Sequence, residues 1–387
     1  MSSTWLKNIK GDVNDGLVTI DPKIREKFNN LSKEKKEASL KAVTFILYPF
    51  ELNEQQQKPF EQKEIETIDF IINHLKQFDK PYIATSFGSD SIILMHIVMR
   101  ACNKLCIKYP DMILMDTLNT FKEEKAYWEK IQTLWKIKNY VRIIKPPKDK
   151  EGKQQTVWSI ANKVGHLPIM RQTNFRNKKS KTSRTQMEIG GQGLGIPECC
   201  NILKKDGIKE YMKTLPIDKR YNCCFVGTRA EESKLRAMSV LQRCRTYMKK
   251  WIGKDKIRVV TPLSYWLQSD IENYYKKYDI PKNPAYKAHD MKRMGCSSCP
   301  AHKNWEIRLA QDPTEEGFGM LRQNLLLTKK FIENNTENKF RLINSVNVLK
   351  EFLKDSNQSG HLSLTQKQKI IKIIKEFNED TSIEDYV

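Results

Sequence analysis

Long apolar runs are missing from this sequence. In a chain of 387 residues that is 39% hydrophobic, no stretch approaches the ~18 apolar residues that a helix needs to span a bilayer. The first residues, MSSTWLK, also lack the apolar core of a signal peptide. We therefore expect a cytoplasmic protein with no membrane partner.

Acidic residues are scarce relative to basic ones. The chain has 46 Asp and Glu against 68 Lys and Arg, which gives a formal net charge of +22. An excess of this size favours a polyanionic partner, and we expect that partner to be nucleic acid, either DNA or tRNA. The alternative is a generally Lys-rich composition that has no specific partner.

A disulfide framework is not expected, because cytoplasmic chains keep their thiols reduced. The nine cysteines therefore indicate metal binding or redox chemistry. Four of them form two pairs, the adjacent Cys199 and Cys200 and the Cys296-x-x-Cys299 step that follows a glycine. Four thiolates complete a zinc site or hold a 4Fe-4S cluster, and unliganded thiols are the third alternative.

The other cysteines are expected to have no chemical role. Cys223 and Cys224 lie in a short apolar run that predicts a buried strand, where cysteine is a common small core residue. Cys102, Cys106 and Cys244 are interpreted as ordinary helix positions.

The segment from Tyr82 to Ile97 organises the rest of the chain. A short apolar run leads into the turn SFGSDS at 86–91, and apolar residues at helical spacing follow. This order predicts a strand, a tight loop and a helix N-terminus, where backbone N–H groups and the helix dipole face a bound anion. Gly88 permits close approach to a phosphate, and the serines add hydroxyl donors. An ordinary corner with Ser or Asp as N-cap is the alternative.

Strands and helices alternate around this turn. Strands are predicted at 81–86, 112–115 and 141–144, with helices from about 90 to 107 and from about 122 to 136 between them. Alternation of this kind predicts an α/β fold with a parallel sheet covered by helices on both faces. Ligands of such sheets bind at the carboxyl ends of the strands.

We divide the chain into three parts. A helical N-terminal extension covers 1–78, the α/β domain covers 79–312, and a helical C-terminal tail covers 313–387. The α/β domain contains an insert at 171–197 whose first half is basic and whose second half is rich in glycine. The insert is either a solvated loop or a mobile basic flap beside a phosphate site.

Charged side chains follow two of the predicted strands. Asp116 comes after the second strand and is placed to orient Mg²⁺, a ribose or an attacking group, or else to cap a helix. Gly227 and Arg229 follow the strand at 223–226, so that Arg229 directs a permanent cation at a phosphate or sulfate, and Arg236 lies on the helical continuation. Salt bridging on a helix surface is the alternative for the arginines.

Five motifs in this order resemble the phosphoadenylyl sulfate (PAPS) reductase family of the PP-loop adenine nucleotide α-hydrolase superfamily. The resemblance runs from about Pro81 to Pro300 and implies a Rossmann-like sheet. The motifs are Ser86-x-Gly88-x-Asp90-Ser91, Asp116-Thr117 with Tyr127, Gly227-x-Arg229 with Arg236, Pro262-Leu263-x-x-Trp266 before Asp270-Ile271, and Pro281-x-Asn283-Pro284-x-Tyr286.

The resemblance also implies roles for individual residues. The bound group would be ATP or adenylyl sulfate with Mg²⁺, and the four cysteines would hold a 4Fe-4S cluster, as in adenylyl sulfate reductases and DNA phosphorothioation sulfurtransferases. Catalytic roles fall on Asp90, Asp116 and Arg229. The nucleotide-binding residues would be Ser86, Gly88, Ser89, Asp90, Ser91, Gly227, Arg229 and Arg236.

One departure from the family shapes the functional hypothesis. Sulfonucleotide reductases carry a nucleophilic cysteine near the C-terminus in a Glu-Cys-Gly-Leu-His tail, and this chain has no cysteine after Cys299. We expect an enzyme that adenylates an acceptor for sulfur transfer to nucleic acid, supplied by a sulfur donor protein such as a cysteine desulfurase. The alternatives are a sulfite-forming reductase that uses an external thiol and a non-catalytic binding component of a larger complex.

Overall fold

The computed structural model describes most of the chain outside the N-terminus and the insert. The described residues are 13–14, 17–18, 52–165, 167, 198–233, 236–237, 239–240, 245–250, 256–289, 295–299, 305–312, 314–332 and 336–378. The insert predicted at 171–197 and Cys244 lie outside these residues. The first described elements are β1 (Val13–Asn14) and β2 (Leu17–Val18), which pair antiparallel.

The chain forms two compact units, each built from several segments. The first contains Met1–Leu114, Ile137–Arg142 and Met212–Lys282, and the second contains Met115–Lys136, Ile143–Tyr211 and Asn283–Val387. This grouping follows packing, whereas the three-part division expected from the sequence follows chain order and stays a prediction.

A six-stranded sheet is the centre of the α/β fold, with strand order β5-β4-β3-β6-β8-β7. Strand β3 pairs in parallel with β4 and β6, and β6 pairs in parallel with β8, whereas β7 is antiparallel to β8. This mostly parallel sheet confirms the predicted class. The strands are β3 (Pro81–Thr85), β4 (Asp111–Met115), β5 (Val141–Ile144), β6 (Cys223–Val226), β7 (Thr246–Lys250) and β8 (Lys256–Val260).

Strand β6 is buried on both faces, as is typical of strands in parallel sheets. Cys223, Cys224 and Phe225 are all buried, so that both faces of the strand contact the core. Burial raises the pKa of both thiols to about 12. The interpretation of this cysteine pair as part of a buried strand is confirmed.

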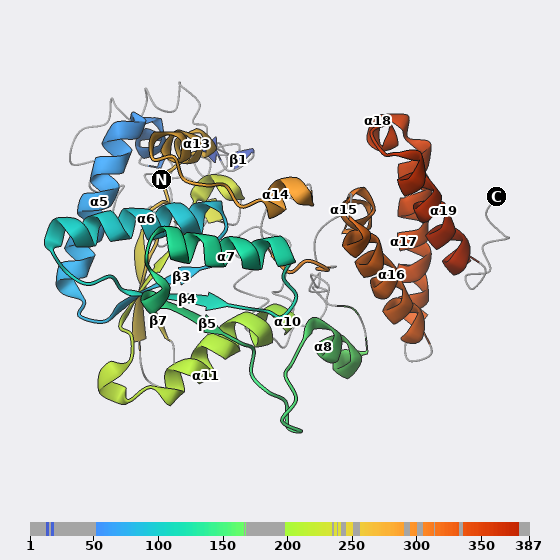
Figure 1. Cartoon of the computed structure of the whole chain (residues 1–387), viewed down its shortest axis with the longest axis horizontal. Coiled ribbons are helices and arrows are strands. Elements are labelled where there is room, and N and C mark those ends of the chain that lie inside the picture. The colour runs from blue at the N-terminus through green and yellow to red at the C-terminus, as the bar shows by residue number, and fades with distance from the viewer. Residues whose placement is uncertain are drawn as a thin grey trace, which may run out of the picture. The chain divides into compact units, whose positions relative to one another are not determined.

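Three helices of the first unit pack together, as Figure 1 shows: α5 (Phe60–Gln77), α6 (Ser89–Leu105) and α13 (Gln268–Lys277). Glu64 of α5 joins them, because it accepts hydrogen bonds from Arg100 of α6 and from Lys277 of α13. Burial opposes the charge of Glu64, but these donors and Tyr278 lower its pKa. The first unit also contains the short turns η1 (Lys138–Tyr140), η3 (Ile217–Lys219) and η4 (Ala230–Glu232).

The second unit is largely helical. It contains α7 (Lys122–Leu134), α8 (Val157–Val164), α10 (Glu198–Cys200), the π-helical turn η2 (Asn201–Asp206) and α14 (Ala285–Ala288). Helix α11 (Gly207–Thr214) spans the boundary between the two units.

The C-terminal helices of this unit enclose a core of their own, to which Leu342, Val346 and Leu349 contribute at helical spacing. The predicted helical tail is confirmed. These helices are α15 (Trp305–Gln311), α16 (Glu315–Lys330), α17 (Thr336–Lys354), α18 (Ser356–Ser359) and α19 (Leu364–Asn378). Within the described ranges, no helix combines the length and the apolar character needed to cross a membrane.

Candidate functional site

The loop between β3 and α6 has the predicted strand–loop–helix form. Gly88 is the N-cap of α6 and has an extended backbone with φ −75°. The left-handed residue is instead Phe87, at φ 52°, although this region costs a residue with a side chain about 1–2 kcal/mol. Its ring is fully buried and its N–H donates to Thr85 Oγ1 at 3.1 Å. Nothing in the sequence signalled this role for Phe87.

Serine hydroxyls line the same loop. Ser86 Oγ lies 3.2 Å from Ser91 Oγ and accepts a hydrogen bond from the Gly88 N–H at 3.4 Å. Tyr275 of α13 donates its hydroxyl to the carbonyl of Ser89 at 3.2 Å. The loop therefore presents hydroxyl groups and the N-terminus of the long helix α6 together, an arrangement that suits an anion.

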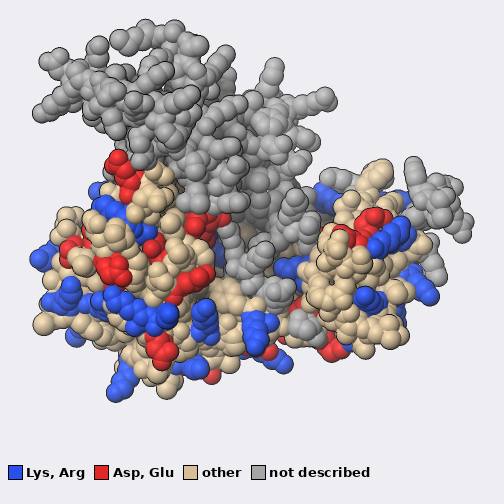
Figure 2. Space-filling view, turned by 90° about the horizontal axis from the view of Figure 1, so that it is seen from above, with Lys and Arg blue, Asp and Glu red and all other residues tan. Residues whose placement is uncertain are grey.

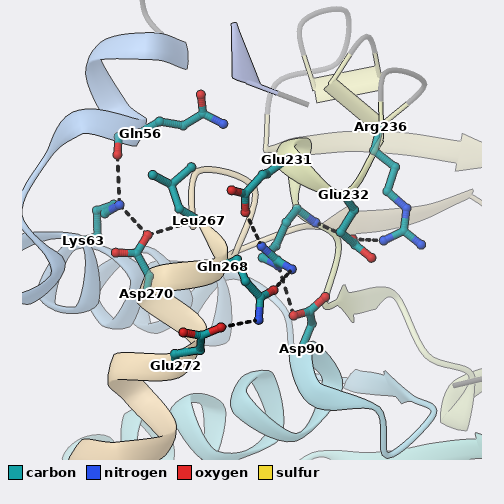
Figure 3. Close-up of polar contacts among 11 residues, drawn as sticks. Gln56, Lys63, Asp90, Glu231, Glu232, Arg236, Leu267, Gln268, Asp270 and Glu272 are labelled. Carbon is teal, nitrogen blue, oxygen red and sulfur yellow. Dashed lines mark hydrogen bonds and ion pairs between the residues drawn. The ribbon is translucent and has the colours of Figure 1, made fainter. Parts of the chain in front are cut away.

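Arg229 contacts three side-chain acceptors at this end of the sheet. It is only 5% exposed, and its Nε donates to Asp90 Oδ1 at 3.0 Å. Its other two nitrogens donate to Glu231 at 2.7 Å and to Gln268 at 2.9 Å. Figure 3 shows these acceptors converging from three elements of the first unit. The structure thus brings Asp90 and Arg229 together, and the guanidinium holds the loop aspartate.

Arg236 lies seven residues after Arg229 in the sequence. It forms an ion pair with Glu232, and Glu232 in turn accepts the backbone N–H of Arg229 at 3.1 Å. The salt-bridge alternative is therefore realised for Arg236, whose side chain is 39% exposed. Its proposed contact with a phosphate stays a prediction.

Gly227 lies where the end of β6 meets the start of α6. A Cβ atom at this position would lie 3.0 Å from the carbonyl oxygen of Asp90 and 3.3 Å from the backbone nitrogen of Ser91. Real Cβ atoms rarely approach backbone so closely, so a residue larger than glycine would push against the first turn of α6. Gly227 therefore supports the loop by close packing.

Asp116 belongs to the second unit and organises the turn that follows β4. Its Oδ1 accepts the N–H of Leu118 at 2.9 Å, and its Oδ2 lies 3.5 Å from Lys125 Nζ. Leu118 has a left-handed backbone with φ 59°, which is compatible with this side-chain-to-backbone turn. The predicted role of Asp116 beside a nucleotide or metal stays a prediction.

The four predicted ligand cysteines line one small cavity within the second unit. Its wall consists of Val157, Leu203 and Lys204 together with Cys199, Cys200, Cys296 and Cys299. The first pair lies at the end of α10, directly before a π-helical turn, and turns of this kind are frequent at functional sites. Residues 97 positions apart in the sequence (Cys199 and Cys296) thus meet as the spacing predicted.

The Cys296–Cys299 turn is fixed from the outside by buried polar side chains. The Cys299 N–H donates to the Cys296 carbonyl at 3.2 Å, closing the turn. The two serines between them are buried, and both hydrogen-bond Asn119 at 2.7 Å. Because Asn119 belongs to the turn that Asp116 organises, that turn supports the cysteine site.

The cavity thiols differ in acidity, and Cys200 is the one whose pKa is lowered. The Cys199 thiol donates to Cys200, and this hydrogen bond with the nearby Lys204 and Lys205 lowers the pKa of Cys200 to about 6, although burial opposes the shift. The same hydrogen bond raises the pKa of Cys199, and burial raises that of Cys296. Partial desolvation opposes the charge of Lys204, but the four sulfurs raise its pKa.

Among the described residues, no group of three or more His, Cys, Asp or Glu side chains has the geometry for holding one metal ion. The four cysteines line one cavity, and thiolates are the donor set of a metal–thiolate centre.

The comparisons with known proteins agree with the motifs. Residues 80–302, more than half of the chain, match the phosphoadenosine phosphosulfate reductase domain. The chain belongs to this family. The resemblance seen in the sequence is confirmed, and the phosphoadenosine phosphosulfate reductase domain contains both the 86–91 loop and the two cysteine pairs.

Relatives of this family member are distant. It is 23% identical over 243 residues to sulfate adenylyltransferase subunit 2 of Aliarcobacter butzleri, which covers 59% of this chain and 66% of that protein, slightly under two thirds of its length. It is 24% identical over 255 residues to the same subunit of Saccharophagus degradans, covering 61% and 70%.

Solved structures with similar regions include the phosphoadenylyl-sulfate reductase of Candida auris, with a TM-score of 0.36, 15% identity, and coverage of 67% of this chain and 92% of that one. The FMN adenylyltransferase of Candida glabrata has a TM-score of 0.37 and 10% identity, and covers 62% and 67%.

Proposed function

We propose that this phosphoadenosine phosphosulfate reductase family member binds an adenine nucleotide at residues 86–91 and adenylates an acceptor for sulfur transfer. The Asp90–Arg229 contact carries the proposal. It places a carboxylate, two hydroxyl groups and a helix N-terminus at one loop, with the aspartate held by a permanent cation. An aspartate held in this way is suited to a Mg²⁺–phosphate group.

The loop residues would share the work of binding. The serine hydroxyls and the first-turn amides of α6 would bind the phosphates of ATP. Gly88 would permit their close approach, while Gly227 would support the loop by close packing. Asp90 would orient the Mg²⁺, and Arg229 would set the position of Asp90 and offset charge that develops on the α-phosphate. Arg236 would add a second cation on release from Glu232. Asp116 would assist at the adenosine or at the metal.

The four-cysteine cavity would hold an iron–sulfur cluster rather than a single zinc ion. The cavity that all four cysteines line supports this choice, as does the adjacent Cys199–Cys200 pair, which is unusual for structural zinc. When bound there, a 4Fe-4S cluster would supply thiolate-ligated iron for carrying sulfur or electrons. The chain's own contribution would be the hydrogen bond from Cys199 and the charge of Lys204, which both lower the pKa of Cys200, and the apolar side chains of Val157 and Leu203 in the cavity wall.

The acceptor in this proposal is nucleic acid, and the net charge of +22 supports it. On the face drawn in Figure 2, Lys and Arg are interspersed with Asp and Glu over the described surface. The sulfur would come from a donor protein such as a cysteine desulfurase. Because the relatives are named as subunits of sulfate adenylyltransferase, a partner subunit is a further expectation.

A sulfite-forming reductase is the second candidate. The family match supports it. Its first step would require a thiol that attacks the sulfate sulfur.

The deciding experiment measures pyrophosphate release from ATP by protein purified without oxygen, with and without DNA or tRNA. Release that nucleic acid stimulates would support adenylation and point to the acceptor. Sulfite formation from adenylyl sulfate with an added thiol, in the absence of pyrophosphate release, would favour the reductase. Binding of nucleic acid with neither reaction would mean a non-catalytic component.

A further inference from the structure

The amide of Gln268 is the third acceptor of the Arg229 guanidinium. Gln268 begins α13, and its Oε1 accepts Arg229 at 2.9 Å while its Nε2 donates to Glu272 at 3.2 Å. The amide is therefore held at both ends, as Figure 3 shows. Unlike the two carboxylates that contact Arg229, this acceptor is neutral, so it directs the guanidinium without adding charge.

Asp270 fixes the first turn of α13, where Gln268 lies. The Asp270 carboxylate accepts the Leu267 N–H at 2.6 Å, which caps the start of α13. The same oxygen is paired with Lys63 of α5, and both side chains are at most 5% exposed. Lys63 also donates to the Gln56 carbonyl at 3.0 Å. A buried ion pair thus locks the first turn of α13 to α5.

A second contact joins the same two segments. Trp266 Nε1, just before α13, donates to Thr67 Oγ1 of α5 at 2.9 Å. Lys63 and Thr67 are one helical turn apart on α5, so they hold α13 from one face of that helix. Both residues precede the matched family domain, which begins at residue 80.

From these contacts we propose that Gln268 and Lys63 are positioning residues of the nucleotide site. Lys63 fixes the first turn of α13 through Asp270, Gln268 aligns Arg229, and Arg229 holds Asp90 at the loop. This inference rests on the proposed nucleotide function. It makes α5, which lies outside the family domain, a working part of that site.

The physical reason lies in the geometry of the guanidinium. Its planar fork satisfies three acceptors in fixed directions. Without Gln268, Arg229 keeps only Asp90 and Glu231, and it is free to rotate toward a two-pronged pairing with either carboxylate. Asp90 then loses its single orientation. Because Asp90 would orient the phosphate-bound Mg²⁺ both before and during the reaction, the expected loss is in substrate binding rather than in the chemical step.

The test compares Gln268→Leu with the matched control Ser269→Ala in the full chain. Both side chains are solvent-exposed neighbours on α13, so neither substitution should unfold the protein. We expect Gln268→Leu to raise the KM for ATP about tenfold, with kcat changed less than threefold. Hydrogen exchange at the amides of 88–92 should accelerate. Gln268→Glu keeps an acceptor oxygen for Arg229 but loses the donor to Glu272, so it should restore both quantities in part.

Like Gln268→Leu, Lys63→Met should raise the KM for ATP and accelerate hydrogen exchange at 88–92. It should also lower the melting temperature. The positioning role of Gln268 is wrong if Gln268→Leu matches Ser269→Ala in the KM for ATP and in hydrogen exchange at 88–92, while Asp90→Ala abolishes pyrophosphate release. A wild-type protein that binds no adenine nucleotide would overturn the proposed function instead. In that case, hydrogen exchange at 88–92 still tests the positioning role of Gln268. Faster exchange in Gln268→Leu would support that role, and unchanged exchange rates would overturn it.

Discussion

Arg229 and Asp90 are 139 residues apart in the sequence and lie in contact, with Arg229 Nε 3.0 Å from Asp90 Oδ1. The contact joins the loop after β6 to the first turn of α6, at the carboxyl ends of two neighbouring parallel strands. Ligands of α/β sheets bind at this edge. The buried guanidinium of Arg229 compensates the negative charge of Asp90 at this edge.

Arg229→Lys should weaken the nucleotide site without removing the positive charge. Lysine presents one point charge and cannot satisfy three acceptors in a plane. Because hydrogen bonds to charged groups contribute about 1.5–3 kcal/mol, we expect kcat/KM for pyrophosphate release to fall by about 10- to 100-fold. Steady-state kinetics measures this, with Arg322→Lys as control, since Arg322 contacts Glu376 on the exposed surface of the C-terminal helices. Equal losses in both variants would refute the assignment.

Gly227→Ala should disturb the loop through packing alone. The new methyl group would lie 3.0 Å from the Asp90 carbonyl oxygen and displace the first turn of α6. Overpacking of this kind costs about 1–3 kcal/mol, so both thermal stability and nucleotide affinity should decrease. Gly319→Ala is the control, because a Cβ there meets nothing within 4 Å. Nucleotide affinity by calorimetry that is unchanged in Gly227→Ala would contradict the close-packing role.

Cys200→Ala should abolish the metal content of protein purified without oxygen. Cys200 is the cavity thiol whose pKa is lowered, to about 6, so its loss removes the ligand that is already ionised at neutral pH. Cys106→Ala is the matched control, because Cys106 is exposed at the end of α6. Iron and acid-labile sulfide are measured by chemical assay. Iron retained in Cys200→Ala, or zinc in the wild type, would exclude the proposed cluster.

The pairing of His289 makes stability depend on pH. This buried side chain contacts Asp312 at 2.8 Å and Glu123 at 3.0 Å. Burial opposes protonation, but the two carboxylates outweigh it and raise the pKa of His289. Its stabilisation is therefore complete below the unfolded value of about 6.5 and is lost as pH rises through the higher folded pKa.

Nuclear magnetic resonance titration of the histidines should place the pKa of His289 above that of a free imidazole, with His289→Gln used to assign its signal. The urea midpoint of the wild type should fall across that pKa as the pH rises. His289→Gln keeps polar contacts but does not titrate, so this part of the pH dependence should disappear. A folded pKa at or below 6.5 would show that the carboxylates do not dominate.

Local order along the chain was sufficient to predict the elements of the site. The strand–loop–helix at 81–105 follows from apolar periodicity and a Ser/Gly turn. Both signals depend only on residues that are close in the sequence. The four cysteines were singled out by residue type and spacing, because a Cys-x-x-Cys turn favours one geometry wherever it occurs. The buried strand at 223–226 was likewise predicted from its continuous apolar run.

Only the tertiary structure decided what Arg229 contacts. Polar residues such as Gln268 and Glu231 have no periodicity that marks their partners, and the Lys63–Asp270 pair joins residues 207 positions apart. The left-handed backbone of Phe87 is equally unmarked, since burial of its ring, a property of the whole core, compensates the local strain. The sequence by itself therefore determined which side chains the candidate site contains. The folded chain determined which of these side chains form hydrogen bonds and ion pairs with one another.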